Sequence, residues 1–102
     1  MDFQVFLSAD ALSDLERIVA YIAPHNAIAA ERLGNQLLDR ALSLSTFPER
    51  GRMVPEFRRP ELREIISRSY RIIYRINHAD SSLEIVRFWH GTRGFPHIPG
   101  MA

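Results

Sequence analysis

The chain has 102 residues, of which 46% are hydrophobic and 25% are charged, a size and composition typical of one folded domain. It contains no cysteine, which excludes disulfide bridges and thiolate metal sites. The sequence has no apolar run near the roughly 18 residues that a membrane span needs, and an acid stands where a signal peptide would be basic. We therefore expect a single domain over residues 1–102 that is cytoplasmic and not membrane-bound.

The formal net charge of +1 hides an uneven distribution of charge along the chain. Residues 1–49 carry seven acidic and three basic side chains, whereas residues 50–102 carry five acidic and ten basic ones. A basic C-terminal half favours an anionic partner, such as nucleic acid or an acidic peptide. An ordinary solvated surface is an equally good interpretation of the composition alone.

The N-terminal half predicts one short strand followed by two helices. Residues 2–7 alternate in polarity as a strand does. Ser8 is suited to cap a helix whose apolar residues recur at helical spacing until Pro24 stops it. Asn26 is suited to cap a second helix that ends before Phe47. Because only about three residues join the two helices, they must fold back on each other as an antiparallel hairpin.

The C-terminal half predicts a loop followed by three strands. Residues 48–61 hold three of the six prolines and form the loop. Polarity then alternates with a period of two over residues 62–68, 70–77 and 83–90, and the intervening residues favour turns. The tail is too rich in glycine and proline for regular structure. The element order is β-α-α-β-β-β, an α+β fold in which the helical hairpin covers one face of an antiparallel sheet.

This arrangement predicts one apolar core and one open face of the sheet. The core residues that we expect are Leu15, Ile18, Ile22, Leu33, Leu37, Ile72, Tyr74 and Ile85. In the last strand, simple alternation puts Leu83, Ile85, Arg87 and Trp89 on a common face. Arg71 and Arg75 lie on the opposite face of their strand from Tyr74. No element is left to cover that face, so we expect it to meet solvent or a partner.

Five segments, taken in order, resemble the ParE/RelE superfamily of type II toxin–antitoxin toxins, and its ParE branch most closely. They are DLERIVAYIA, NAIAAERL, FPERGRMVPE, LREIISRSYRIIYRI and IVRFWHGTR, although Thr92 replaces an arginine often found in the ParE branch. The resemblance implies one of two activities. ParE-like members inhibit DNA gyrase by trapping it on cleaved DNA, whereas RelE-like members cut messenger RNA on the ribosome without a metal. In both branches a cognate antitoxin wraps the toxin, which implies a hetero-oligomer.

The residues favour the gyrase inhibitor over the endonuclease. Metal-free RNA cleavage needs groups that transfer protons, and arginine can essentially only stabilise charge because its pKa exceeds roughly 12. The chain has no lysine, and no tyrosine follows the last predicted strand. His90 is the one candidate general base, with Glu56 or Glu64 as possible helpers, yet a strand-end histidine more often bonds nearby backbone. We expect a gyrase inhibitor and not an enzyme; a ribosome-dependent messenger RNA endonuclease and a toxin fold without toxicity are the alternatives.

Two sets of candidate contact residues follow. The predicted target-binding residues are Arg63, Arg71, Arg75, Arg87, His90 and Arg93. For the antitoxin, apolar helix positions outside the core-facing stripe predict an exposed groove with positive charge beside it. The predicted antitoxin-binding residues are Leu12, Val19, Leu38, Leu42 and Arg71. The other histidines lack metal-ligand spacing, and we expect neither a metal nor a cofactor.

Overall fold

The computed structural model describes residues 2–101. The elements are β1 (Gln4–Leu7), α1 (Ala9–Ile22), α2 (Ala27–Leu42), η1 (Ser43–Ser45), β2 (Arg52–Met53), β3 (Leu62–Ser67), β4 (Tyr70–Asn77) and β5 (Ser82–His90). The predicted α+β order is confirmed, with the two-residue strand β2 added inside the predicted loop. Within residues 2–101, no helix is both long and apolar enough to cross a bilayer.

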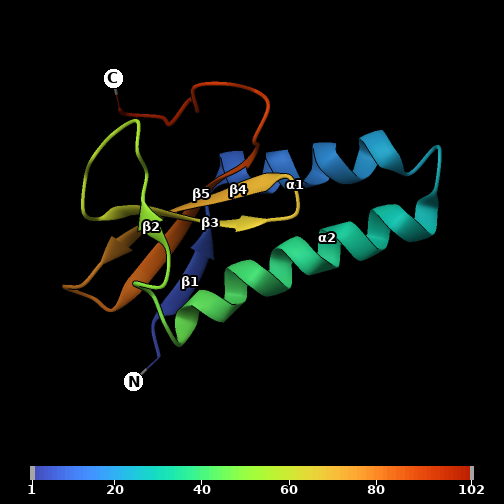
Figure 1. Ribbon diagram of the computed structural model, residues 1–102. Helices are drawn as coiled ribbons and strands as arrows, with labels where there is room; N and C mark the ends of the chain where they lie inside the picture. Colours follow the sequence, from blue (N-terminus) through green and yellow to red (C-terminus); the bar gives the residue numbers. More distant parts are fainter. Residues whose placement is uncertain (1, 102) are drawn as a thin grey trace.

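Local sequence signals set the ends of both helices. The Ser8 hydroxyl accepts a hydrogen bond from the first turn of α1, and the Asn26 side chain does the same for α2. Helix α1 ends at Ile22, just before Pro24, and α2 folds back along it as the predicted hairpin (Figure 1). Gly34 lets the helices approach closely, because a Cβ there would lie 2.9 Å from Cγ2 of Val19.

The five strands form one mixed sheet in the order β1-β5-β4-β3-β2. Strands β3, β4 and β5 form the predicted antiparallel meander. Strand β1 adds to the edge of β5 in parallel and pairs with it only as far as Ile85. The rest of β5 therefore has no strand on its outer side, and helix α1 runs past it instead.

Strand β5 contains an extra residue that changes which side chains share a face. Ile73 pairs with Arg87 while the next residue of β4 pairs with Ile85, so Val86 bulges out. Beyond this bulge Phe88 joins the face of Ile85, and Trp89 turns to the other face. The predicted common face for Leu83, Ile85, Arg87 and Trp89 is therefore wrong after Ile85.

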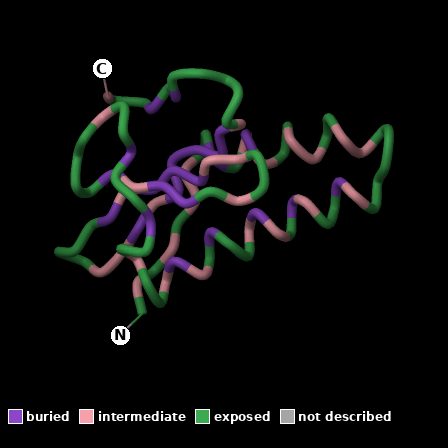
Figure 2. The backbone as a smooth tube through the Cα atoms, in the orientation of Figure 1, coloured by how far each residue is buried: buried purple, intermediate pink, exposed green. Residues whose placement is uncertain are grey.

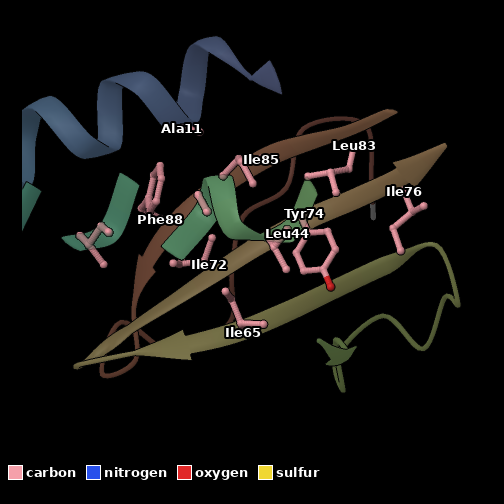
Figure 3. Close-up of a cluster of buried hydrophobic side chains, with 11 residues drawn as sticks. Ala11, Leu44, Ile65, Ile72, Tyr74, Ile76, Leu83, Ile85 and Phe88 are labelled. Carbon is pink, nitrogen blue, oxygen red and sulfur yellow. The ribbon is translucent and has the colours of Figure 1, made fainter. Parts of the chain in front are cut away.

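The main core lies between the helical hairpin and one face of the sheet (Figure 3). Its buried members are Ala11, Leu37, Ala41, Leu44, Ile65, Ile72, Tyr74, Ile76, Leu83, Ile85 and Phe88. Leu15, Ile18 and Leu33 pack against it half-buried, in agreement with the predicted core. The far end of the hairpin projects beyond the sheet (Figure 1). Ile22 lies in this part of α1 and differs from the prediction, because it lines a cleft and is not part of the core.

A second apolar cluster covers the sheet face that was expected to be open. Val54, Leu62, Ile73, Val86, Trp89 and Ile98 are buried in it. The loop after β2 supplies Val54 and the C-terminal tail supplies Ile98, so both irregular segments fold over the sheet (Figure 2). The expectation of an open face is wrong, because a segment without periodicity can still bury apolar side chains.

Candidate functional site

The arginines on the second face of the sheet are held by carboxylates. Arg71 donates two hydrogen bonds to Glu56, at 2.9 and 2.7 Å, and its Nε donates to Glu64 at 2.6 Å. Glu64 is fully buried and also accepts a 2.7 Å hydrogen bond from Arg52. The hydrogen bonds with Glu56 raise the pKa of Arg71 and, in return, lower the pKa of Glu56. Glu56 thus anchors its loop on Arg71, whose side chain is only 11% exposed.

Arg75 on this face is also engaged within the fold, and so is Arg63, which pairs with Tyr74 and therefore lies on the first face. Arg63 donates to the carbonyl oxygen of Gly51 at 3.0 Å. Arg75 lies 3.5 Å from a carboxylate oxygen of Glu84, its cross-strand partner. Both side chains therefore already have an anionic or carbonyl oxygen beside them. An anionic ligand that binds Arg63 on one face or Arg75 on the other would have to compete with these internal contacts.

Arg87 is buried and ties α1 to the unpaired edge of β5. Its Nε and Nη2 donate to the two carboxylate oxygens of Asp14 at 2.8 and 2.7 Å. Asp14 also accepts the backbone N–H of Phe88 at 3.1 Å, which satisfies a donor that no strand pairs. Nη1 donates to the carbonyl of His97 in the tail at 2.8 Å. The hydrogen bonds to Asp14 raise the pKa of Arg87, which stays charged inside the fold.

His90 ends β5 on the first face of the sheet, opposite Tyr70 of β4. Their rings meet edge to face, with centroids 5.0 Å apart. Nδ1 of His90 accepts the backbone N–H of Thr92 at 3.2 Å, and the Thr92 hydroxyl lies 2.7 Å from the same atom. This hydrogen bond assigns the proton of the neutral ring to Nε2. His90 therefore bonds nearby backbone, as strand-end histidines commonly do, and its neutral form offers no free basic nitrogen.

The predicted target-binding residues do not form one site. Tyr70 pairs with His90, and the next residue, Arg71, pairs with Trp89, so His90 and Arg71 face opposite sides of the sheet. Arg87 is buried at the sheet edge, and the guanidinium of Arg93 lies over the Trp89 ring, 3.9 Å from its centroid. Among residues 2–101, no three potential ligand side chains gather as a metal site requires.

A cleft separates the end of the sheet from the projecting part of the hairpin. It consists of two cavities of about 410 and 340 Å³ that share Ile22, Tyr70 and His90. Its other lining residues include Arg17, Ile18, Tyr21, Arg32, Leu33, Arg68, Phe88 and Arg93. Of this group, the sequence reasoning selected only His90 and Arg93 as site residues. The others come from the helices, from the turn between β3 and β4 or, as Tyr70 and Phe88 do, from the core-facing side of β4 and β5.

A separate groove of about 650 Å³ runs along the outer side of the hairpin, between α1 and α2. Its lining residues are Leu15, Glu16, Val19, Ala20, Ala23, Ala27, Ala30, Glu31, Gly34, Asn35 and Leu38. Val19 and Leu38 of the predicted antitoxin-binding set therefore share this groove. Leu12 and Leu42 are exposed, at 50% and 45%, and lie outside its lining.

Known proteins resemble this chain over most of its length. Residues 5–95 match the family described as ParE toxin of type II toxin-antitoxin system, parDE. Toxin RelE1 of Caulobacter vibrioides is 38% identical over 96 residues, which is 89% of this chain and 96% of the relative. Toxin RelE2 of the same organism is 37% identical over 91 residues, covering 88% and 97%.

Two solved structures share the fold. A chromosomal ParDE TA system from P. aeruginosa matches with a TM-score of 0.71 and 15% identity, over 86% of this chain and 95% of that one. The toxin-antitoxin complex RelBE2 from Mycobacterium tuberculosis matches with a TM-score of 0.68 and 22% identity, over 88% and 99%. Together with the sequence match over residues 5–95, these findings mean that the chain belongs to the ParE/RelE family of type II toxin–antitoxin toxins.

Proposed function

We propose that the protein inhibits DNA gyrase by contact and does not cut RNA. Metal-free RNA cleavage needs a free proton acceptor beside an arginine, and the observation that carries this proposal is that His90 offers no such acceptor. Arg71 lies on one face of the sheet, saturated by Glu56 and Glu64, and His90 lies on the other. Nδ1 of His90 is also occupied by Thr92. In its neutral form His90 therefore has no free nitrogen to accept a proton, so the arginines that line the same cleft, Arg68 and Arg93 among them, have no general base to act with.

An inhibitor that acts by contact needs an accessible surface and no proton transfer. Among the predicted target-binding residues, Arg93 is exposed and has no carboxylate partner within residues 2–101. Its guanidinium is already oriented over Trp89, so little side-chain freedom would be lost on binding. His90, at the end of β5, lies beside it, since the backbone N–H of Arg93 donates to the carbonyl oxygen of His90 at 3.0 Å and both residues line the cleft. We therefore assign the first target contacts to this end of the sheet.

Expression of the chain without its antitoxin tests the proposal in cells. We expect slowed growth with DNA-damage signalling, while messenger RNAs stay intact. Codon-specific messenger cuts within minutes, with undamaged DNA and with cutting abolished by His90→Gln, would establish the endonuclease instead. Normal growth at a verified level of folded toxin would favour a toxin fold without toxicity.

We also propose that a cognate antitoxin places an amphipathic helix in the outer groove of the hairpin. The lining of the groove is mostly apolar: Val19 and Leu38 share it with alanines and Gly34, small residues that let another helix approach closely. Glu16 and Glu31 line it as well, so the helix should present neutral or basic residues to them. An acidic antitoxin stretch along the sheet would have to displace Glu56 before it could pair with Arg71.

Binding kinetics with the cognate antitoxin separate these contributions. Leu38→Asp should raise Kd strongly through faster dissociation, because it puts a charge in the groove floor. Leu12→Asp is the matched variant, because Leu12 is an exposed leucine outside the groove. It should bind like the wild type if the groove alone holds the antitoxin helix, and more weakly if the wider set predicted from the sequence, which includes Leu12, makes contact. Higher salt should mainly slow association. Equal effects of the two leucine variants, or loss of the complex through Arg71→Ala alone, would contradict this assignment.

A further inference from the structure

Arg93 lies in the irregular segment after β5, yet its backbone is fixed on both sides. Its own N–H donates to the carbonyl oxygen of His90 at 3.0 Å. On the other side, the indole N–H of Trp89 donates to the carbonyl oxygen of Gly94 at 3.2 Å. Gly94 has a φ of 83°, a left-handed conformation that favours glycine. These contacts hold the turn from residue 90 to residue 94 in one shape.

The side chain of Arg93 is held by the same tryptophan. Its Cζ atom lies 3.9 Å from the centroid of the Trp89 ring. Trp89 is 4% exposed and packs in the second apolar cluster, so the ring itself has little freedom to move. Tryptophan is the aromatic side chain whose face attracts a cation most strongly. Because Arg93 is exposed, its guanidinium rests on a rigid support and still meets solvent.

A second arginine near this ring is neutralised by its own carboxylate. Cζ of Arg87 lies 4.9 Å from the same centroid. Two guanidinium groups beside one ring repel each other, which would weaken the hold on Arg93. Asp14 offsets this repulsion, because both of its carboxylate oxygens accept hydrogen bonds from Arg87, at 2.8 and 2.7 Å. Of the two, only Arg93 has no carboxylate partner within residues 2–101.

The extra residue in β5 decides which side of the sheet Trp89 faces. Without the bulge at Val86, regular alternation would put Trp89 on the face of Ile85, between the sheet and the hairpin. With the bulge, Trp89 lies in the second cluster. Bulges are frequent next to functional sites, because one extra residue re-aims the side chains that follow it. Here the bulge supplies the ring on which Arg93 rests.

We infer that Trp89 is a positioning residue, whose ring presents Arg93 to the target in the conformation that binds. The inference rests on the proposed function, in which Arg93 makes one of the first contacts with gyrase. A ring that only filled the second cluster would contribute stability and no affinity. A ring that orients Arg93 reduces the side-chain freedom lost on binding, so its contribution to affinity exists only while Arg93 is present.

A double-variant cycle in the gyrase supercoiling assay tests this dependence. Trp89→Leu should raise the toxin concentration for half-inhibition about two- to fivefold, the range expected for losing a cation–ring contact at an exposed site. The same change made together with Arg93→Gln should add nothing, because the side chain that the ring orients is gone. Trp89→Phe keeps a ring and should lie between the wild type and Trp89→Leu.

Leu62→Ala is the matched control for lost stability. Leu62 is a fully buried member of the same cluster, so this variant should lower Tm and, assayed well below its Tm, inhibit gyrase like the wild type. If Leu62→Ala weakens inhibition as much as Trp89→Leu does, or if Trp89→Leu has the same effect with and without Arg93, the role of Trp89 is only structural and the inference is overturned.

The fluorescence of Trp89 reports the contact without gyrase, because the chain has one tryptophan. Arg93→Gln should change the emission of the folded protein. Arg40→Gln should not, since Arg40 is an exposed arginine of α2 and, among the described residues, only Arg87 and Arg93 lie over the ring. Identical emission from Arg93→Gln and the wild type would overturn the inference.

The same cycle measured on growth of expressing cells separates this inference from the proposed function. Growth arrest without gyrase inhibition counts against the proposed function, and the cycle on growth then decides whether Trp89 positions Arg93. Gyrase inhibition with equal effects of Trp89→Leu in both backgrounds counts against the inference alone. A folded wild type that neither inhibits gyrase nor slows growth overturns both.

Discussion

Replacing Asp14 by alanine removes three hydrogen bonds and leaves the Arg87 guanidinium buried without a counter-charge. The two side chains are 3% and 8% exposed, so water cannot readily replace the lost carboxylate. Removing one partner of a buried ion pair typically costs about 3–5 kcal/mol. For a domain of this size, that loss should lower Tm by at least about 12 °C. The Phe88 N–H would also lose its acceptor at the unpaired edge of β5.

Chemical denaturation followed by circular dichroism measures this loss. The double variant Asp14→Leu with Arg87→Met should recover part of the stability, because it removes both charges and keeps apolar volume. Glu84→Ala is the control, since it breaks a half-exposed pair with Arg75 and should cost less than about 1 kcal/mol. The reasoning is refuted if Asp14→Ala and Glu84→Ala unfold with the same free energy, or if the double variant is less stable than Asp14→Ala.

Two further predictions concern the core and the loop that covers the second face. Leu37 is fully buried, so Leu37→Ala should lower the free energy of unfolding by about 2–5 kcal/mol. Leu42 lies on the exposed side of the same helix, so Leu42→Ala should lower it by less than about 0.5 kcal/mol. Chemical denaturation measures both values. The hydrogen bond from Arg71 lowers the pKa of Glu56 in the folded state. The ion pair therefore stabilises the fold fully above the pKa of Glu56 in the unfolded chain, near 4.5, and this stabilisation is lost as the pH falls through the lowered pKa of the folded state. Glu56→Gln should therefore be less stable than the wild type near neutral pH and equal to it in acid, and an unchanged difference in unfolding free energy across this range would contradict the role of Arg71.

The parts of the fold that were predictable are those with periodic sequence. Residues 70–77 alternate cleanly, and Ser8 and Asn26 mark both helix starts, so strand and helix positions followed from the sequence. The bulge at Val86 was not predictable, because an inserted residue leaves composition unchanged and only reverses the alternation after it. The cover over the second face was missed for a related reason: Ile98 lies in a segment with no period to indicate burial.

The site was harder to predict, because it depends on long-range packing. Arg17 and Arg32 lie in the acidic half of the chain and reach the end of β5 only because the hairpin projects past the sheet. Whether Arg71 is free to bind a partner depends on Glu56, which lies in a non-periodic loop that folds over the sheet. Asp14 could have been noticed, since an acid one helical turn before Ile18 lies on the buried stripe of α1.

The most direct test of the central claim uses purified gyrase. The chain is added to gyrase, relaxed plasmid and ATP, and both supercoiled product and protein-linked cleaved DNA are followed; a parallel translation mixture reports cuts in messenger RNA. We predict that supercoiling falls with toxin concentration and that cleaved DNA accumulates, while the messenger stays intact. Undiminished supercoiling together with messenger cuts that disappear in His90→Gln would contradict the account.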